Sequence, residues 1–290
     1  MPNPFALKQD MAVLLDQLKK THPAAPEVLR QRLVSRLQFA AQTGRPFPAG
    51  SRILDVGCGL GDDVCALLDL GYDAYGVDVL ELWDSDFGLY WEQREKPKGS
   101  HLHRLHAVRL PHYQLPFPDA YFDLALSEQL FEHVFNPEEV FSEIARVLKP
   151  DAISLHHFPG PNQWMEGHIH VPVPVLCRYK PWVLLWALAG RRSSGQEGFT
   201  WKKTYVTNLE TMKYCRYPTK GELRRCAARA QVRIDFTEAQ EIRMRPLGRV
   251  SRMMNAMPAL LRGAVARAIS LFAQRLMVIY GCGRKADSNT

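Results

Sequence analysis

The chain has 290 residues, of which 46% are hydrophobic and 23% are charged, as in an ordinary globular protein. This length allows one large domain with additions, and the composition excludes a collagen-like, coiled-coil or largely disordered chain. The first ten residues lack the regions of a secretory signal, and the longest apolar run, at 181–190, is too short to span a membrane. The six cysteines form no CxxC pair, so we expect buried thiols in the reducing cytoplasm.

The formal net charge of +7 is concentrated in one segment. Seven arginines and one acidic residue lie between Glu241 and Arg275, so the rest of the chain is close to neutral. This distribution indicates one basic segment and not a protein that binds nucleic acid over its whole surface.

The first half of the chain changes from helical to alternating elements. Residues 1–50 place apolar side chains at helical spacing, which predicts an N-terminal helical cap. From 51 to 158 short apolar runs alternate with helical patterns, which predicts a parallel α/β sheet covered on both faces. We expect strands at 52–57, 73–79, 103–110, 121–129 and 152–158, and helices at 62–71 and 136–148.

The alternation stops at residue 159. Residues 159–217 are rich in Pro, Trp, His and Tyr and predict an insertion of loops and short helices that builds the acceptor site. Core elements return in 218–290, with a basic helical insertion at about 241–273. In this last part we expect a helix at 219–230 and strands at 231–239 and 275–285, which makes seven strands in total.

A glycine-rich loop, DVGCGLGDD, follows the first predicted strand. Ligands of open parallel sheets bind at the carboxyl ends of the strands. A dinucleotide site needs GxGxxG with a phosphate on the helix N-terminus, but here Gly57, Gly59 and Gly61 form GxGxG and two aspartates follow. These carboxylates would repel a phosphate. The loop therefore favours a ligand with a positive centre, and Asp78 is the expected carboxylate for a ribose diol.

Several segments between Arg52 and Pro150 carry a resemblance to a known family. ILDVGCGLG, GVDV and LPFPDAYFDLALSEQLFEHVFNPEEVFSEIARVLKP, in this order, resemble the class I S-adenosylmethionine-dependent methyltransferases of type 11. The resemblance implies a Rossmann-like fold, S-adenosylmethionine as cofactor and S-adenosylhomocysteine as product. The cofactor residues that it implies are Asp55, Gly57, Cys58, Gly59 and Gly61 for the amino acid part, Asp78 with its neighbour Val79 for the ribose, and Ser127 and Glu128 beside the transferable methyl.

The sequence departs from this family pattern at two places. The stretch VRLPHYQLPF lacks the carboxylate that many relatives place near the adenine, so backbone groups near Arg109 and Leu110 are expected to read the adenine. Asp151 and Ala152 stand where relatives have two glycines after RVLKP, which predicts an altered turn without consequence for the cofactor.

Histidines after the fifth predicted strand, in SLHHFPGPNQWMEGHIHVP, are the candidates for the acceptor side. A hydroxyl acceptor benefits from a general base, and the candidate catalytic residues are His156, His157, Glu166 and His168. Their alternative role is packing and hydrogen bonding in a loop, as we expect for His133 at the start of the helix that follows it. Glu166 and the HxH pair have the residue types of a zinc site, but their spacing is loose, so no metal is expected.

These observations predict methyl transfer from S-adenosylmethionine to a small-molecule or glycan-like acceptor, at oxygen. Nucleic-acid methylation is not indicated, because SEQL replaces the Asn/Asp-Pro-Pro-aromatic element that base methyltransferases carry after the fourth strand. A non-catalytic S-adenosylmethionine-binding scaffold protein of the same fold is the first alternative, and an NAD-dependent oxidoreductase is the second. The sequence does not name the acceptor.

The basic segment 243–275 combines arginines with apolar residues at helical spacing. This pattern predicts weak contact with an anionic membrane surface by a cytoplasmic protein that is peripheral to the membrane. The alternatives are a helix packed over the acceptor cleft and a homodimer interface. The apolar face would comprise Leu260, Leu261, Ala264, Val265, Ala268, Leu271 and Phe272.

Overall fold

A computed structural model describes residues 26–43, 46–59, 61–79, 102–108, 112–193, 195–244, 257–272 and 274–281. The chain divides into two compact units. The first unit comprises residues 1–127, 143–154 and 281–285, and the second comprises 128–142, 155–280 and 286–290. Within the described ranges, no helix combines the length and the apolar character that crossing a membrane requires.

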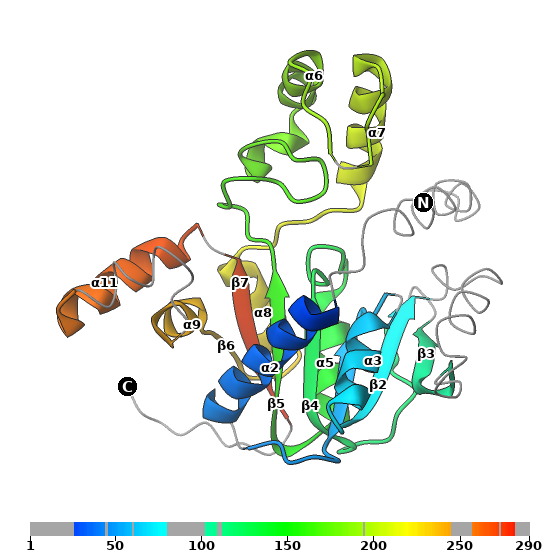
Figure 1. Ribbon diagram of the computed structural model, residues 1–290, viewed down its shortest axis with the longest axis vertical. Coiled ribbons are helices and arrows are strands. Elements are labelled where there is room, and N and C mark those ends of the chain that lie inside the picture. Colours follow the sequence, from blue (N-terminus) through cyan, green and yellow to red (C-terminus); the bar gives the residue numbers. More distant parts are fainter. Residues whose placement is uncertain are drawn as a thin grey trace. The chain divides into compact units, whose positions relative to one another are not determined.

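Seven strands form a sheet in the order β3-β2-β1-β4-β5-β7-β6 (Figure 1). β1 pairs in parallel with β2 and β4, β2 pairs in parallel with β3, and β6 pairs antiparallel with β7. The expected Rossmann-like, mostly parallel seven-stranded sheet is thus confirmed. The strands are β1 (Arg52–Val56), β2 (Asp73–Val79), β3 (Leu105–Val108), β4 (Phe122–Glu128), β5 (Leu148–Phe158), β6 (Ile234–Phe236) and β7 (Arg275–Tyr280).

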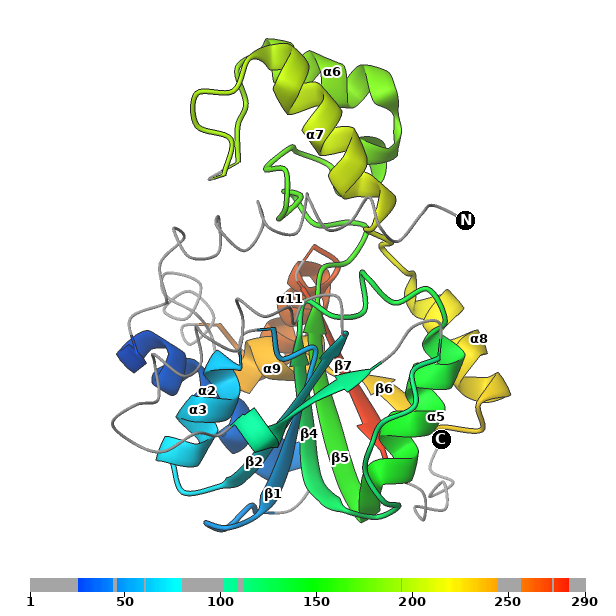
Figure 2. The same ribbon diagram turned by 90° about the vertical axis from the view of Figure 1, so that its right-hand side faces the viewer.

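In the first unit, two helices cover the strands next to the glycine loop. α3 (Asp62–Asp69) packs against β1 and β2, and α2 (Pro26–Thr43) packs against α3 (Figure 2). α3 begins after Gly61 with two aspartates in its first turn, where the helix dipole favours acidic side chains. Its Val64 and Leu67 are buried, so the helix holds the loop that precedes it at the end of β1. A short 3₁₀ turn, η2 (Leu102–Arg104), precedes β3.

The chain passes directly from α5 (Pro137–Val147) into β5. α5 has Glu138 and Glu139 in its first turn and Arg146 in its last, an order that complements the helix dipole. At the turn where two glycines were expected, Asp151 has a φ of 64°. This aspartate therefore adopts the left-handed conformation that glycine accepts most easily and that aspartate tolerates better than most residues.

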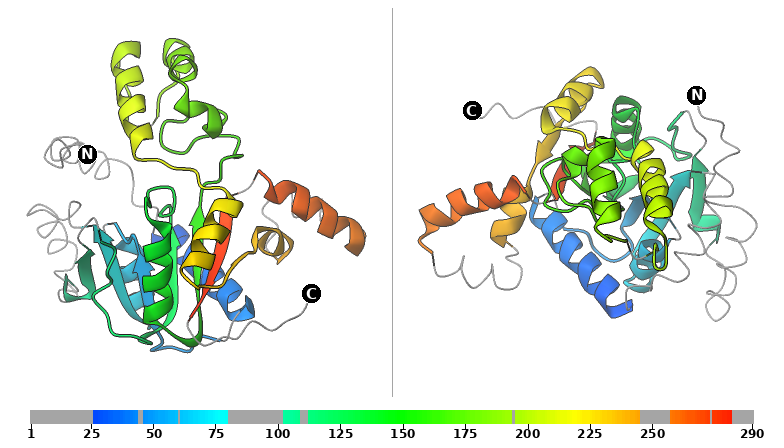
Figure 3. Two further views of the ribbon diagram at one scale, coloured as in Figure 1. Left: turned by 180° about the vertical axis from the view of Figure 1, so that it is seen from behind. Right: turned by 90° about the horizontal axis from the view of Figure 1, so that it is seen from above.

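The second unit contains the remaining helices. α6 (Lys180–Leu188) and α7 (Trp201–Lys213) lie side by side (Figures 1 and 2), and α11 (Ala259–Ser270) packs against α9 (Glu238–Met244) (Figure 3). η3 (Pro174–Arg178) precedes α6, and α8 (Lys220–Arg229) precedes β6. The Thr219 side chain caps α8 by accepting from the backbone N–H of Glu222, as the T-x-x-E spacing predicts. The domain boundaries that we assigned from the sequence stay a prediction.

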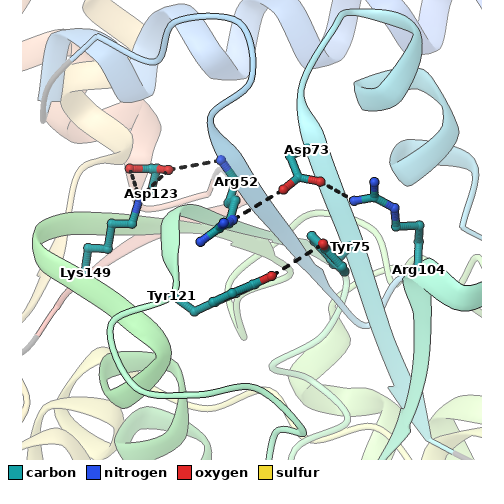
Figure 4. A network of polar contacts seen from close by, with 7 residues as sticks. All are labelled: Arg52, Asp73, Tyr75, Arg104, Tyr121, Asp123 and Lys149. Atoms are coloured by element: carbon teal, nitrogen blue, oxygen red, sulfur yellow. Dashed lines mark hydrogen bonds and ion pairs between the residues drawn. The ribbon is translucent and has the colours of Figure 1, made fainter.

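A network of polar contacts joins the strand starts of the first unit (Figure 4). Asp123 Oδ2 accepts from the backbone N–H of Arg52 at 3.0 Å, and both Asp123 oxygens accept from Lys149 Nζ at 2.9 Å. Asp73 accepts from Arg52 Nε at 3.3 Å and from Arg104 Nη1. Each of the two aspartates therefore has two partners, which ties the first residues of β1, β2 and β4 together.

Two arginines of this network also stack on the rings of tyrosines. The Arg52 guanidinium lies 4.3 Å from the ring centre of Tyr121, and the Arg104 guanidinium lies 4.6 Å from that of Tyr75. The two tyrosine hydroxyls lie 3.5 Å apart. These stacking contacts add to the ion pairs, since an aromatic face attracts a cation.

Candidate active site

The glycine loop adopts a conformation that glycines allow. Gly57, Gly59 and Gly61 have φ values of 77°, 51° and 71°, which residues with a side chain rarely adopt. The N–H groups of Gly57 and Cys58 both donate to the Val77 carbonyl, at 2.8 and 3.0 Å. Among the described residues, no heavy atom lies within 4 Å of where a Cβ of Gly59 would stand. The loop is therefore tied to the end of β2 and leaves open space beside Gly59.

Gly76 allows the close approach of β2 to this loop. A Cβ at residue 76 would lie 2.7 Å from Cys58 Sγ, a separation at which the two atoms would overlap. Burial, followed by the nearby Asp55 carboxylate, raises the pKa of the Cys58 thiol well above its usual value. Cys58 therefore stays protonated and serves packing, not nucleophilic chemistry.

Asp78 is held at the end of β2 by two backbone hydrogen bonds. Its Oδ2 accepts from the Gly59 N–H at 2.6 Å, and its Oδ1 accepts from the Val79 N–H at 2.7 Å. Each oxygen retains a further lone pair, so the carboxylate can still accept two hydroxyl hydrogen bonds. Burial raises the pKa of Asp78, although the two N–H groups oppose this effect.

Asp55 is the second carboxylate at this edge of the sheet, with 6% of its surface exposed. Burial, and then repulsion from Asp63, raises its pKa well above the usual value. A positively charged ligand nearby would favour the ionised form. The loop therefore suits a cationic ligand with a vicinal diol, and the residues present fit S-adenosylmethionine in both respects.

Of the two aspartates that we expected to repel a phosphate, Asp63 is paired with cations. Asp63 already faces two arginines of α2, with Oδ1 2.7 Å from Arg32 Nη2 and Oδ2 3.6 Å from Arg36 Nη1. These cations compensate the charge of Asp63 in part, since Asp63 still raises the pKa of Asp55. Asp55 and Asp78 are therefore the carboxylates that remain for a cationic ligand. No local sequence pattern predicts the pairing of Asp63, because its partners are about thirty residues away.

The remaining expected cofactor residues occupy the following places. Val79 ends β2 and is half-buried, Ser127 is buried near the end of β4, and Glu128, the last residue of that strand, is partly exposed. Arg109 and Leu110 lie outside the described residues. Their role toward the adenine stays a prediction.

In the second unit, the two histidines at the end of β5 lie in buried surroundings. His156 is fully buried, and its ring lies 5.1 Å from that of Phe131, edge to face. Burial lowers the pKa of His156 to about 3, so this ring is neutral. His157 is 9% exposed, and its Nε2 lies 3.1 Å from Glu241 Oε1. These surroundings agree with a role in packing and hydrogen bonding, which was the alternative to a catalytic role for both histidines.

The other two candidates, Glu166 and His168, contact each other. Glu166 is fully buried; its Oε2 accepts from the N–H groups of His168 and Ile169, at 2.8 and 2.5 Å. Its Oε1 lies 2.7 Å from His168 Nδ1 and accepts from the Tyr217 hydroxyl. Burial opposes ionisation, but the hydrogen bonds from His168 and Tyr217 outweigh it and keep the pKa of Glu166 below its usual value. Burial would lower the pKa of His168, but Cys215 and Glu166 raise it to about 10.

Sequence reasoning missed three neighbours of this pair. Glu132 is fully buried, and burial raises its pKa to about 7. His133 does not bond at the start of α5 as expected: its Nδ1 lies 2.9 Å from the carbonyl oxygen of Tyr214. Cys215 Sγ lies 3.7 Å from His168 Nδ1. These contacts join residues more than forty positions apart, so no local pattern could have found them.

Comparison with known proteins finds similarity to methyltransferases. The family model described as a methyltransferase domain matches residues 54–155. Sterol 24-C-methyltransferase ERG6B of Gibberella zeae is 33% identical over 42% of this chain and 30% of its own length. The O-methyltransferase cnsE of Penicillium expansum is 32% identical over 45% of this chain and 44% of its own length.

One solved structure is similar over more of the chain. The S-adenosylmethionine-dependent methyltransferase from Mesorhizobium loti covers 85% of this chain and 97% of its own, with 16% identity and a TM-score of 0.45. Across the first curated relatives, the matched part spans 26% to 59% of the relative's length. The match to the methyltransferase domain therefore covers β2, β3, β4 and most of β1 and β5, the strands around the glycine loop.

Proposed function

We propose that this protein transfers a methyl group from S-adenosylmethionine to a small-molecule or glycan-like acceptor, at oxygen. The single observation that carries the cofactor part is the Asp78 carboxylate, which is held by the Gly59 and Val79 N–H groups and retains acceptor capacity on both oxygens. When bound, the cofactor supplies a methyl group on a positively charged sulfur.

The residues of the glycine loop and of the ends of β1, β2 and β4 have distinct roles in this proposal. Asp78 binds the ribose diol, and the glycine loop 57–61 lets the backbone approach the amino acid part of the cofactor. Asp55 balances the positive charge of the ligand when it is ionised. Burial and Asp63 disfavour this ionised form in the free protein. Ser127 and Glu128 border the methyl group. Holding the methyl in line with the acceptor supplies most of the rate enhancement in such a reaction.

The Glu166–His168 pair is the proposed acceptor side. Glu166 is fixed by two backbone N–H groups and Tyr217, so it orients the His168 ring. Because the pKa of this ring is raised to about 10, the ring has to lose its own proton before it can accept that of an acceptor hydroxyl. His156 and His157 are less suited to contact an acceptor because both are buried. The relative named as an O-methyltransferase supports oxygen as the acceptor atom, whereas the sterol relative is named for methylation at carbon.

The test is a turnover assay that follows S-adenosylhomocysteine release over a panel of hydroxylated small molecules and oligosaccharides. His168→Ala and Glu166→Ala should lower turnover at least tenfold and leave cofactor affinity unchanged. His170→Gln, which alters the other histidine of the HxH pair, is the matched control and should retain activity. Cofactor binding with no turnover on any acceptor would favour the scaffold alternative instead, and equal turnover in both variants would remove the pair from the reaction.

We also propose that the protein is cytoplasmic and that α11 contacts an anionic membrane surface. On the expected apolar face, Leu261, Leu271 and Phe272 are 50%, 56% and 65% exposed, and Arg267 is exposed on the same helix. Basic helices with exposed apolar side chains bind anionic lipid surfaces, with about 1 kcal/mol per arginine. Co-sedimentation with phosphatidylserine vesicles at low salt should be lost in Leu271→Ser/Phe272→Ser, and a wild-type protein that stays in the supernatant would contradict the proposal.

A further inference from the structure

Three potential metal ligands converge in the second unit. His133, His168 and Cys215 each offer one ligand atom, and these atoms all lie within 4.8 Å of one another. The three residues follow β4, β5 and α7 in the chain, so the fold brings together side chains from three separate loops. The Cys215 thiol is free and 6% exposed.

His133 is oriented as a metal-binding histidine would be. Its Nδ1 lies 2.9 Å from the Tyr214 carbonyl oxygen, which can only accept a hydrogen bond, so Nδ1 carries the proton. Nε2 of the neutral ring therefore has a free lone pair. A backbone carbonyl that fixes the tautomer in this way is typical of the second shell of a metal site.

His168 has the carboxylate partner that accompanies many metal-binding histidines. Glu166 Oε1 lies 2.7 Å from His168 Nδ1, and the N–H groups of His168 and Ile169 with the Tyr217 hydroxyl fix the carboxylate in place. A carboxylate–histidine pair of this kind orients the ring and raises its basicity as a ligand. The ring of His168 lies edge to face with that of His133, 5.1 Å between centres.

Glu132 supplies an independent observation. Its side chain is fully buried, and neither carboxylate oxygen has a hydrogen-bond partner among the described residues. The carboxylate interacts electrostatically with His168. An unpartnered buried carboxylate is costly, and a cation bound by the neighbouring side chains would offset that cost.

We propose that His133, His168 and Cys215 bind a zinc ion, with the buried Glu132 compensating its charge. Two imidazoles and one thiolate are a ligand set that zinc prefers over magnesium or calcium. Tetrahedral zinc places such atoms roughly 3.3–3.6 Å apart, so the ligands need to converge by about 1 Å. Three protein ligands leave one position for water or another ligand. The site differs from the HxH pair considered in the sequence, since His170 is not part of it. Zinc binding can be measured without methyl transfer, but a zinc ion on His168 would replace the proton-transfer role proposed for that ring.

The test uses the full chain purified from zinc-supplemented medium without chelator. Elemental analysis should find about one zinc per chain. Cys215→Ser and His133→Ala should each weaken zinc affinity at least tenfold in competition with a chromophoric chelator. Cys177→Ser is the matched control, because Cys177 is equally buried in the same unit but lies outside the cluster, and it should keep the affinity of the wild type. Cobalt substitution should give a thiolate-to-metal charge-transfer band that Cys215→Ser lacks.

The outcomes separate the proposal from its alternatives. A folded wild-type protein that contains no zinc would overturn it. Equal zinc affinity in Cys215→Ser, or cobalt binding without the thiolate band, would overturn the ligand set. If Cys215→Ser does not fold, two measurements decide in its place. Chelator should lower the wild-type unfolding temperature and leave that of folded His133→Ala unchanged; no effect of chelator on the wild type would contradict the site.

Discussion

The carboxylates at the two ends of the strands in the first unit have different surroundings. At the strand starts, Asp73 and Asp123 each accept from two donors, among them Arg104 and Lys149 (Figure 4). At the strand ends, Asp55 and Asp78 are buried enough that the pKa of each is raised. Carboxylates paired with cations stabilise a fold, whereas buried carboxylates without a cation reduce its stability. We therefore propose that the strand starts stabilise the fold and that the strand ends bind a positively charged ligand.

The largest expected effect comes from a substitution at the strand ends, where the ligand would bind. Asp78→Asn removes the charge and one acceptor, so the affinity for S-adenosylhomocysteine should fall by on the order of 1.5–3 kcal/mol, roughly ten- to hundredfold in Kd. The free energy of unfolding should not fall by a comparable amount. Calorimetric titration and chemical denaturation measure the two quantities. An unchanged Kd would mean that the ribose is held elsewhere.

The next largest effect comes from a substitution at the strand starts, where ion pairs stabilise the fold. Asp123→Ala leaves the Arg52 N–H and Lys149 without their acceptor, so the free energy of unfolding should fall by about 1–2 kcal/mol. The Kd for S-adenosylhomocysteine should stay the same. Asp119→Ala is the control, because Asp119 pairs with Arg146 but its side chain is 78% exposed. A loss of cofactor affinity in Asp123→Ala with wild-type stability would reverse the assigned roles of the two ends.

A third change sharpens the comparison through pH. A carboxyl whose folded-state pKa is raised favours folding below its unfolded-state pKa, and this contribution is lost as pH rises through the folded-state pKa. Asp55→Asn removes that loss, so the free variant should gain stability relative to the wild type as pH rises from 4 to 8, while it binds S-adenosylmethionine more weakly. Denaturation at several pH values checks this prediction. If the difference in unfolding free energy between Asp55→Asn and the wild type does not change with pH, the folded protein does not disfavour the ionised form of Asp55.

The smallest effect concerns the partly exposed ion pairs. Arg104→Ala removes the contact with Asp73 and the stacking on Tyr75, and the loss of stability should be about 0.5–1 kcal/mol. Salt screens exposed charges, so the difference from the wild type should shrink between 0.05 and 0.5 M NaCl, as judged by urea denaturation. A larger effect at high salt would mean that packing and not charge is lost.

The elements that local sequence patterns encode could be predicted from the sequence. β1, the glycine loop and Asp78 lie in one short stretch whose apolar run, glycines and second strand have recognisable periods. β5 was also predicted, but not the burial of both His156 and His157. Neighbouring residues of a strand point to opposite faces, so their burial requires that both faces of β5 be covered there, which depends on the rest of the fold.

The parts that could not be predicted depend on pairs that are distant in the sequence. Arg32 and Asp63 are 31 positions apart, and Cys215 and His168 are 47 positions apart. Arginines on a helical pattern and a lone cysteine in an insertion have many possible partners, and only the packing of α2 on α3, or of the loops in the second unit, selects one. The candidate acceptor side was therefore predicted as a set of residue types, and its contacts came from the structure.

The central claim is that the strand ends of the first unit form an S-adenosylmethionine site. Isothermal titration of the full chain with S-adenosylhomocysteine and, in parallel, with NAD tests it most directly. Binding of S-adenosylhomocysteine that Asp78→Asn weakens at least tenfold, with no heat from NAD, is the predicted result. Tight binding of NAD with no binding of S-adenosylhomocysteine would contradict the account.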